Sequence, residues 1–162
     1  MSNPLSSPDD YATFIHDLPN RYPSLIKSSS LVYIPLGVKI GKVMGMVLFD
    51  STIILCVQEF LNFELHVIEG YGYEVTQSQT TIDALPQAEE YCKASYPGKD
   101  KLYWYDSFPH PNDPSLASTH PHHKHIHPNI KRNRIPAPDL TFTAPNLPFL
   151  IEEVEQTLLS SS

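Results

Sequence analysis

Residues 119–128 read THPHHKHIHP and hold five of the eight histidines of the chain. A sixth histidine, His110, lies just upstream in the stretch YDSFPHP. Because imidazole titrates near neutral pH, two histidines can act as general acid and general base in one reaction. Imidazole is also a common zinc ligand, and it can pack a proline-rich loop by hydrogen bonding to main-chain carbonyls. The cluster therefore admits a catalytic, a metal-binding and a packing interpretation.

The catalytic interpretation fits the cleavage of RNA by its own 2′-hydroxyl. That reaction needs a general base, a general acid and a cation near the pentavalent phosphorus. The candidates are His110, His122, His123, Lys124 and His125, with Asp106 placed to orient an imidazole. Lys124 is expected to be an exposed cation that contributes little to the core. Neighbours in an extended run face opposite sides, so the sequence leaves open which histidine is the acid and which the base.

The metal interpretation rests on the His-x-His spacing, which on a strand puts two rings on one face about 7 Å apart. The candidate zinc ligands are His120, His122, His123 and His125. Asp106 or His110 is available as a further ligand, but no His-Glu-x-x-His pattern is present. The sequence therefore predicts a reaction without a cofactor, with zinc as the alternative.

Charge is unevenly distributed along this acidic chain, whose net charge is −7. Between Ser107 and Pro138 the only acidic residue is Asp113, and the same stretch carries four lysines and arginines. A local cationic patch of this kind is typical of a site for a polyanion. The predicted substrate-binding residues are Lys131, Arg132 and Arg134 for phosphate, and Tyr103 and Tyr105 for stacking on bases.

The cysteine content and the apolar runs indicate a cytoplasmic protein. Two cysteines are too few for a disulfide framework: Cys56 lies in an apolar run and Cys92 in an expected helix, and a reducing setting fits both. No apolar run approaches the roughly 20 residues that a bilayer requires. The polar N-terminus carries no signal-peptide pattern, and a chain of 162 residues is normally one domain.

Apolar periodicity and turn residues predict an α+β fold in which an antiparallel β-sheet meander carries helices at its N- and C-terminal ends. Asp50-Ser51 is the expected turn of a hairpin, Gly70 or Gly72 a bulge, and Asn146 the cap of the last helix. Pro19 and Pro23 are expected to follow the first helix. The predicted elements are a helix at 7–18, strands at 40–49, 52–62, 64–77 and 101–108, helices at 86–95 and 146–159, and a short strand near 123–127 in the loop-rich segment 108–145.

Several of these residues together resemble the TumE-like family of toxins from toxin–antitoxin systems. The resembling positions are Tyr105, Asp106, Pro109, His110, Pro121, His122, His123, Lys124 and His125, preceded by Glu59, Tyr71 and Tyr73. The similarity extends over most of residues 8–158. It implies a small intracellular toxin that acts on RNA and is neutralised by a cognate antitoxin protein.

The sequence thus predicts a single TumE-like domain over residues 1–162, with a proline- and histidine-rich loop segment at 107–145. Its expected function is that of a toxin that cleaves RNA, with RNA and an antitoxin as partners and no membrane. The alternative is a non-catalytic regulatory or protein-interaction domain whose histidine-rich loop binds a metal or a partner. If catalysis is correct, Asp106, His110 and at least two of His122, His123 and His125 should line one open concavity.

Overall fold

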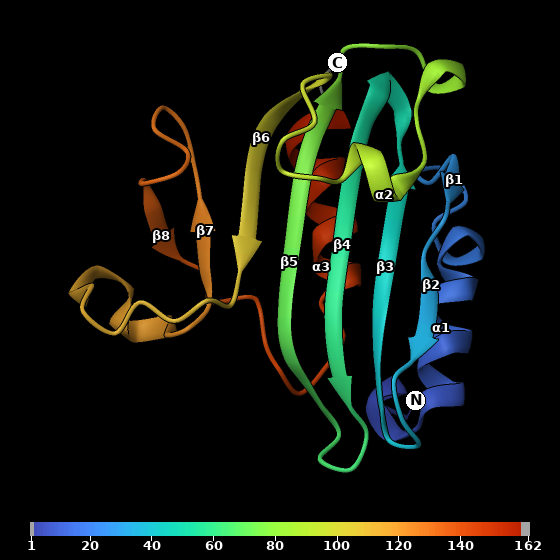
Figure 1. Cartoon of the computed structure of the whole chain (residues 1–162), viewed down its shortest axis with the longest axis vertical. Coiled ribbons are helices and arrows are strands. Elements are labelled where there is room, and N and C mark those ends of the chain that lie inside the picture. The colour runs from blue at the N-terminus through green and yellow to red at the C-terminus, as the bar shows by residue number, and fades with distance from the viewer. Residues whose placement is uncertain (1, 160–162) are drawn as a thin grey trace.

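An antiparallel sheet of eight strands forms the centre of the computed structural model, which describes residues 2–159 (Figure 1). Its strand order is β1-β3-β4-β5-β6-β7-β8, and β2 also pairs with β3. The predicted α+β fold with a meander and terminal helices is therefore confirmed. The strands are β1 (Ser28–Ser29), β2 (Val32–Pro35), β3 (Ile40–Leu48), β4 (Ile53–Asn62), β5 (Val67–Ser78), β6 (Lys99–Asp106), β7 (His123–His125) and β8 (Arg134–Pro136). The helices are α1 (Pro8–Arg21), α2 (Ala88–Tyr91) and α3 (Leu147–Val154), which continues into a π-helical turn at Glu155–Leu159.

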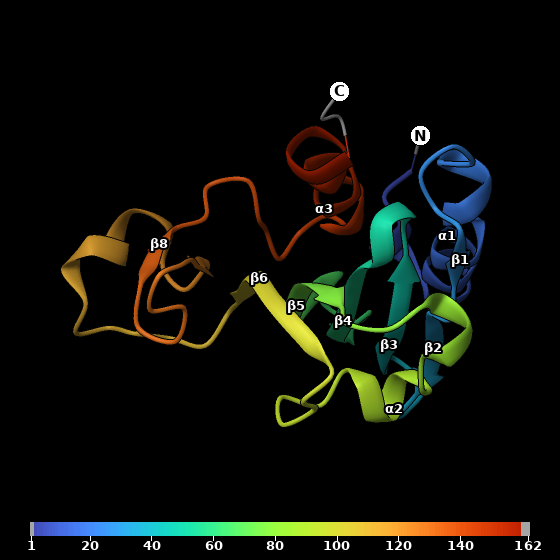
Figure 2. The same cartoon turned by 90° about the horizontal axis from the view of Figure 1, so that it is seen from above.

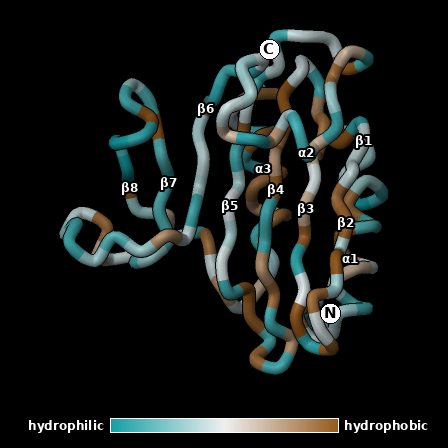
Figure 3. The backbone as a smooth tube through the Cα atoms, viewed as in Figure 1, coloured by the Kyte–Doolittle hydropathy of each residue, from teal (hydrophilic) through white to brown (hydrophobic). Residues whose placement is uncertain are grey.

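Helices α1 and α3 cover one face of the sheet, whereas the short α2 lies against the other (Figure 2). We call the first the helix face and the second the open face. The main hydrophobic core lies between the sheet and the two long helices. Figure 3 shows hydrophobic residues concentrated along β3 and β4, whereas β7 and β8 are mostly hydrophilic. Among the described residues, no helix combines the length and the apolar character that a membrane crossing would need.

The first helix begins as predicted but ends later. The Ser7 hydroxyl accepts a hydrogen bond from the Asp10 amide, and the predicted apolar stripe from Tyr11 to Leu18 is buried. The helix continues through Pro19 to Arg21, so the expectation that it ends before Pro19 is wrong. A proline in the last turn removes one main-chain hydrogen bond, and burial of the apolar face compensates for that loss.

The central hairpin has the predicted position. Met46 pairs with Cys56 and Leu48 with Ile54, and a 3-10 turn at Asp50–Thr52 joins the strands. Phe60 pairs with Gly70 whereas Leu61 pairs with Ile68, which places a bulge beside Gly70 as expected.

A buried carboxyl group links β4 to the core. Glu59 is fully buried and accepts hydrogen bonds from the hydroxyls of Tyr11 (2.7 Å) and Tyr73. Burial raises the pKa of Glu59, and the two hydrogen bonds only partly oppose that effect.

The open face carries a second small core and a disulfide. Met46, Leu48, Ile54 and Tyr91 pack around Cys56, which is bonded to Cys92. Cys56 is buried as expected, but the reducing setting inferred from the two cysteines gave no indication of this bond. The helix predicted at 86–95 is also wrong in length, since α2 has only four residues. The chain turns immediately after α2, and this turn brings Cys92 over β4, with the two Cα atoms 5.7 Å apart.

The C-terminal third adds a protruding extension to the sheet, formed by β7, β8 and the 3-10 helix Pro114–Thr119 (Figure 1). The short strand at the histidine run was expected, whereas β8 was not. The closing helix α3 is confirmed, but Asn146 does not cap it through its side chain. Instead the buried Asn146 amide bonds to the main chain of Thr141 and to the Tyr73 hydroxyl. These contacts satisfy the amide inside the core, so its side chain is unavailable to the helix N–H groups.

Candidate active site at the end of β6

The pairing of β7 with β6 divides the histidine run between the two faces of the sheet. Trp104 pairs with His125, Tyr105 with Lys124, and Asp106 with His123. Successive side chains of a strand point to opposite faces, and directly paired residues point to the same face. Trp104, Asp106, His123 and His125 therefore share the open face, while Tyr105 and Lys124 point to the helix face.

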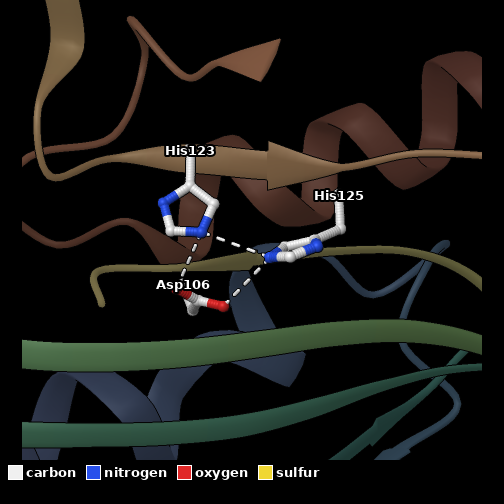
Figure 4. A group of neighbouring side chains, drawn as sticks. All are labelled: Asp106, His123 and His125. Atoms are coloured by element: carbon white, nitrogen blue, oxygen red, sulfur yellow. Dashed lines mark hydrogen bonds and ion pairs between the residues drawn. The ribbon is translucent and has the colours of Figure 1, made fainter. Parts of the chain in front are cut away.

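Asp106, His123 and His125 form a compact group that we call the histidine–aspartate cluster (Figure 4). The Nε2 atom of His123 lies 2.9 Å from Asp106 Oδ1, and that of His125 lies 3.3 Å from Oδ2. The two Nε2 atoms are 3.2 Å apart. Each Nδ1 atom lies 2.9 Å from a main-chain carbonyl oxygen, that of Pro121 for His123 and that of Ile130 for His125. Both rings are therefore held with Nε2 directed at the carboxylate.

Neighbouring groups fix the carboxylate in turn. The indole N–H of Trp104 donates to Asp106 Oδ2 (3.3 Å), and the main-chain N–H of Phe108 donates to Oδ1 (2.9 Å). The Trp104 ring also stacks on His125 at a centroid distance of 4.3 Å. Asp106 keeps 28% of its side chain exposed, whereas His123 keeps 1%. The cluster thus reaches solvent mainly at its carboxylate.

Electrostatic effects in the cluster favour an ion pair. Burial acts to raise the pKa of Asp106, but the hydrogen bonds from His123 and His125 outweigh it, so this pKa lies well below its usual range. Burial acts to lower the pKa of His123, but its bonds to Asp106 and to the Pro121 carbonyl outweigh it, so this pKa is raised. In the metal-free protein the two groups therefore stabilise each other as carboxylate and imidazolium.

His110 and Arg134 lie next to the cluster. The His110 ring packs edge-on against His123 at a centroid distance of 4.8 Å. Arg134 Nη1 lies 2.6 Å from His110 Nδ1 and 2.8 Å from Nε2. A neutral imidazole has one acceptor nitrogen, so one of these two contacts is the hydrogen bond. Partial burial, followed by the positive charges of Arg134 and His123, lowers the pKa of His110.

The remaining members of the run lie on the helix face. The Lys124 ammonium pairs with Glu153 at 3.1 Å and lies 4.3 Å from the centroid of the Tyr103 ring. Its side chain is 20% exposed, so the expectation of an exposed cation is wrong. Tyr103 and Tyr105 are buried, and the Tyr105 hydroxyl donates to Glu153. Alternation along β7 and the closeness of α3 explain why these groups turn away from Asp106.

His122 is also separated from the cluster. Its Nδ1 atom lies 2.7 Å from the Tyr71 hydroxyl, and its ring packs against Phe142. His120 is exposed, and Lys131 and Arg132 are exposed in the connection between β7 and β8. The structure therefore brings together Asp106, His110, His123, His125 and Arg134, and leaves the other predicted site residues apart from them.

Two hollows border this group. Asp106 and Trp104 line a groove of about 330 Å³ that follows the open face as far as the disulfide. His110 and Arg134 line a separate hollow of about 500 Å³. The expected single concavity is therefore divided in two, and His123 and His125 are buried rather than lining it. Trp104 was not among the predicted site residues, although its alternation with Tyr103 and Tyr105 placed it on the same face as Asp106.

The fold and this group of side chains define a small α+β domain. Its candidate site combines one carboxylate with two imidazoles where β6 ends beside β7. The model of the family described as Toxin TumE matches residues 14–158. The chain therefore belongs to the TumE toxin family, and as a toxin of a toxin–antitoxin system it has a cognate antitoxin as partner. Comparison with curated proteins and with solved structures gave no significant match.

Proposed function

We propose that this toxin is a cytoplasmic ribonuclease that cleaves RNA through the RNA's own 2′-hydroxyl, with no metal in the reaction. The observation that supports this function is the contact between two histidines whose neighbours shift their pKa values in opposite directions. His110 lies beside the cation of Arg134, whereas His123 lies beside the carboxylate of Asp106. Environments that separate two pKa values in this way are characteristic of acid–base pairs.

His110 has the properties of the general base. Its neighbour Arg134 disfavours the protonated ring and occupies the acceptor nitrogen, so the lone pair becomes available to the proton of the 2′-hydroxyl once the ring leaves Arg134. His110 belongs to the segment 107–112, where Phe108 is 68% exposed. A base at the surface can meet a polymeric substrate without unfolding of the sheet.

His123 has the properties of the general acid, but it lies beneath His110. Donation of its proton to the leaving 5′-oxygen requires that RNA displace the His110 ring. The same movement frees Arg134, whose buried Nε atom has no hydrogen-bond partner among residues 2–159. Arg134 then supplies the cation that stabilises the phosphorane oxygens. Asp106 positions His123 and keeps it protonated between turnovers.

The groove along the open face offers a path for a single strand. Trp104 is partly exposed at its rim, where an aromatic ring can stack on a base. The Lys101 ammonium lies 5.2 Å from the centroid of the Trp104 ring and adds a cation beside it. The exposed Lys131 and Arg132 would contact phosphates further along the strand.

Burial of the histidine pair favours one alternative. Side chains exposed by only 1% and 7% suit a packed interior better than a substrate site. In that case the protein acts by binding a partner, and the histidine–aspartate cluster only holds the extension of β7 and β8 in place.

The test is cleavage of a labelled RNA by the purified full-length chain in the presence of EDTA. We expect products with 2′,3′-cyclic phosphate or 3′-phosphate ends, and no cleavage of DNA, which lacks the nucleophile. His110→Ala should lower the rate by roughly 10²-fold or more, as expected for loss of a general base. Arg134→Ala should lower it by a similar factor, with partial recovery in Arg134→Lys.

His120→Gln is the matched control, because it removes an exposed histidine of the same run outside the proposed site. Its rate should equal that of the unchanged chain. Cleavage that disappears in EDTA and returns with added metal would contradict the mechanism. Absence of cleavage of any RNA, together with normal growth inhibition on expression, would favour the partner-binding alternative.

A further inference from the structure

In the histidine–aspartate cluster, the acceptor atoms of neutral histidines and of the carboxylate would face one another with no hydrogen between them. The Nδ1–H groups of His123 and His125 donate to main-chain carbonyls, which fixes a lone pair on each Nε2 when the rings are neutral. These two lone pairs face each other at 3.2 Å and also face the carboxylate of Asp106. Such an arrangement requires a positive species at its centre, either protons on the rings or a metal ion.

The distances between the donor atoms suit a metal ion. A tetrahedral zinc ion with bonds of about 2.0–2.1 Å holds its ligand atoms about 3.3 Å apart. The two Nε2 atoms are 3.2 Å apart, and their distances to the nearest carboxylate oxygens are 2.9 and 3.3 Å. The donor atoms are therefore already close to the spacing that a bound ion would impose, and little rearrangement is needed.

The surrounding contacts are those of a supported ligand set. Histidine ligands usually donate their second N–H to a carbonyl or a carboxylate, which orients the ring and makes it more basic. Both rings do so here at 2.9 Å, and Trp104 and Phe108 donate to Asp106. The donor types also select the metal, because two imidazoles favour zinc and similar ions over magnesium or calcium.

We propose that Asp106, His123 and His125 form a binding site for a divalent transition-metal ion, with zinc as the best fit. The three residues leave one tetrahedral position open beside the partly exposed carboxylate. His110 packs against His123 on this side and offers a fourth ligand, the third imidazole, once it leaves Arg134. The argument for this site does not rest on the proposed function, which uses no metal, but the two share Asp106 and His123, and zinc on Nε2 of His123 would block the proton donation assigned to that atom.

The experiment is a titration of the metal-stripped full-length protein with Co²⁺, and then with Zn²⁺ as competitor. Trp104 is the only tryptophan of the chain, and it contacts both His125 and Asp106. Its fluorescence therefore reports on the site directly. We expect Co²⁺ to quench it at one ion per chain and to give the intense visible absorption of a four-coordinate complex. Zn²⁺ should reverse both signals, and Mg²⁺ should change neither.

Two sets of variants separate this site from ordinary histidine binding. Asp106→Asn and His125→Gln should each weaken Co²⁺ binding by about tenfold or more, since even supporting contacts of a metal site have effects of that size. His120→Gln with His127→Gln removes two exposed histidines of the same run and should leave binding unchanged. If a cluster variant is unfolded by circular dichroism, imidazole nitrogen chemical shifts of the unchanged chain give the same answer, because zinc should move the Nε2 signals of His123 and His125.

The outcome that overturns the proposal is equally specific. Co²⁺ binding that vanishes in the His120→Gln, His127→Gln protein but survives in Asp106→Asn would mean adventitious binding by surface histidines. Absence of saturable binding, or binding of Mg²⁺ with the same affinity, would also refute the site. None of these results depends on whether the protein cleaves RNA, so failure of the metal site and failure of the ribonuclease function can be told apart.

Discussion

Reduction of the disulfide between Cys56 and Cys92 should lower the free energy of unfolding by an amount that depends on the length of the loop it closes. The two residues are 36 positions apart in the sequence, so the cross-link removes about 3.8 kcal/mol of loop entropy from the unfolded chain at 25 °C. This figure is an upper value, because the reduced thiols can still pack among Met46, Ile54 and Tyr91. We expect a loss of about 2–4 kcal/mol, the range usual for native disulfides.

The assay is urea unfolding of the oxidised and the reduced protein, followed by circular dichroism. The Cys56→Ala, Cys92→Ala protein is the control, and reductant should have no effect on it. Hydrogen exchange should quicken mainly in residues 86–98, because α2 has only four residues and the bond holds it to β4. Equal unfolding midpoints for the oxidised and reduced forms would refute the reasoning and would mean that packing alone holds this segment.

Three further predictions concern single side chains and metal. Lys124→Ala should lower the melting temperature through loss of the Glu153 ion pair, while a folded variant should keep its cleavage rate; a lost rate would return Lys124 to the catalytic residues. Glu59→Gln should remove a pH dependence of the free energy of unfolding. Because the pKa of Glu59 is raised, the stability contributed by its protonated form is full below pH 4.5 and is lost as the pH rises through the folded-state pKa. The free energies of unfolding of the two proteins, measured at several pH values, should therefore diverge toward neutral pH. EDTA should leave cleavage of RNA unchanged and added Zn²⁺ should slow it, which a rate assay checks; activation by Zn²⁺ would contradict the assigned role of His123.

Local patterns in the sequence were sufficient to predict the long elements. The hairpin of β3 and β4 and the apolar stripe of α1 depend on neighbouring residues, and both were predicted correctly. The disulfide was not, because it depends on how the chain after β5 returns across the sheet. Cys56 and Cys92 meet only once that return is complete.

The sequence predicted which segments contribute to the site, but it did not predict which side chains contact one another. The residue types and the resemblance to the TumE-like family indicated that Asp106 and the histidine run belong together. Which histidines meet the carboxylate depends on the register of β7 against β6, and a strand of three residues amid prolines carries little sequence signal for register. The same uncertainty explains why Lys124 was wrongly predicted to be exposed at the site. A shift of β7 by one residue against β6 would have placed its side chain on the same face as Asp106.

The groups assigned to chemistry all belong to residues 101–134, although the sheet that supports them begins far upstream. During synthesis the ribosome therefore completes α1 and the meander from β1 to β5 before it adds any of them. A polypeptide that terminates before β7 lacks both histidines of the cluster while retaining most of the main core. Under the proposed function, a product that ends before β7 contains the scaffold with Asp106 and His110, but it lacks the general acid His123 and the cation of Arg134. Under that proposal, only chains extended past β8 would carry the complete set of catalytic groups.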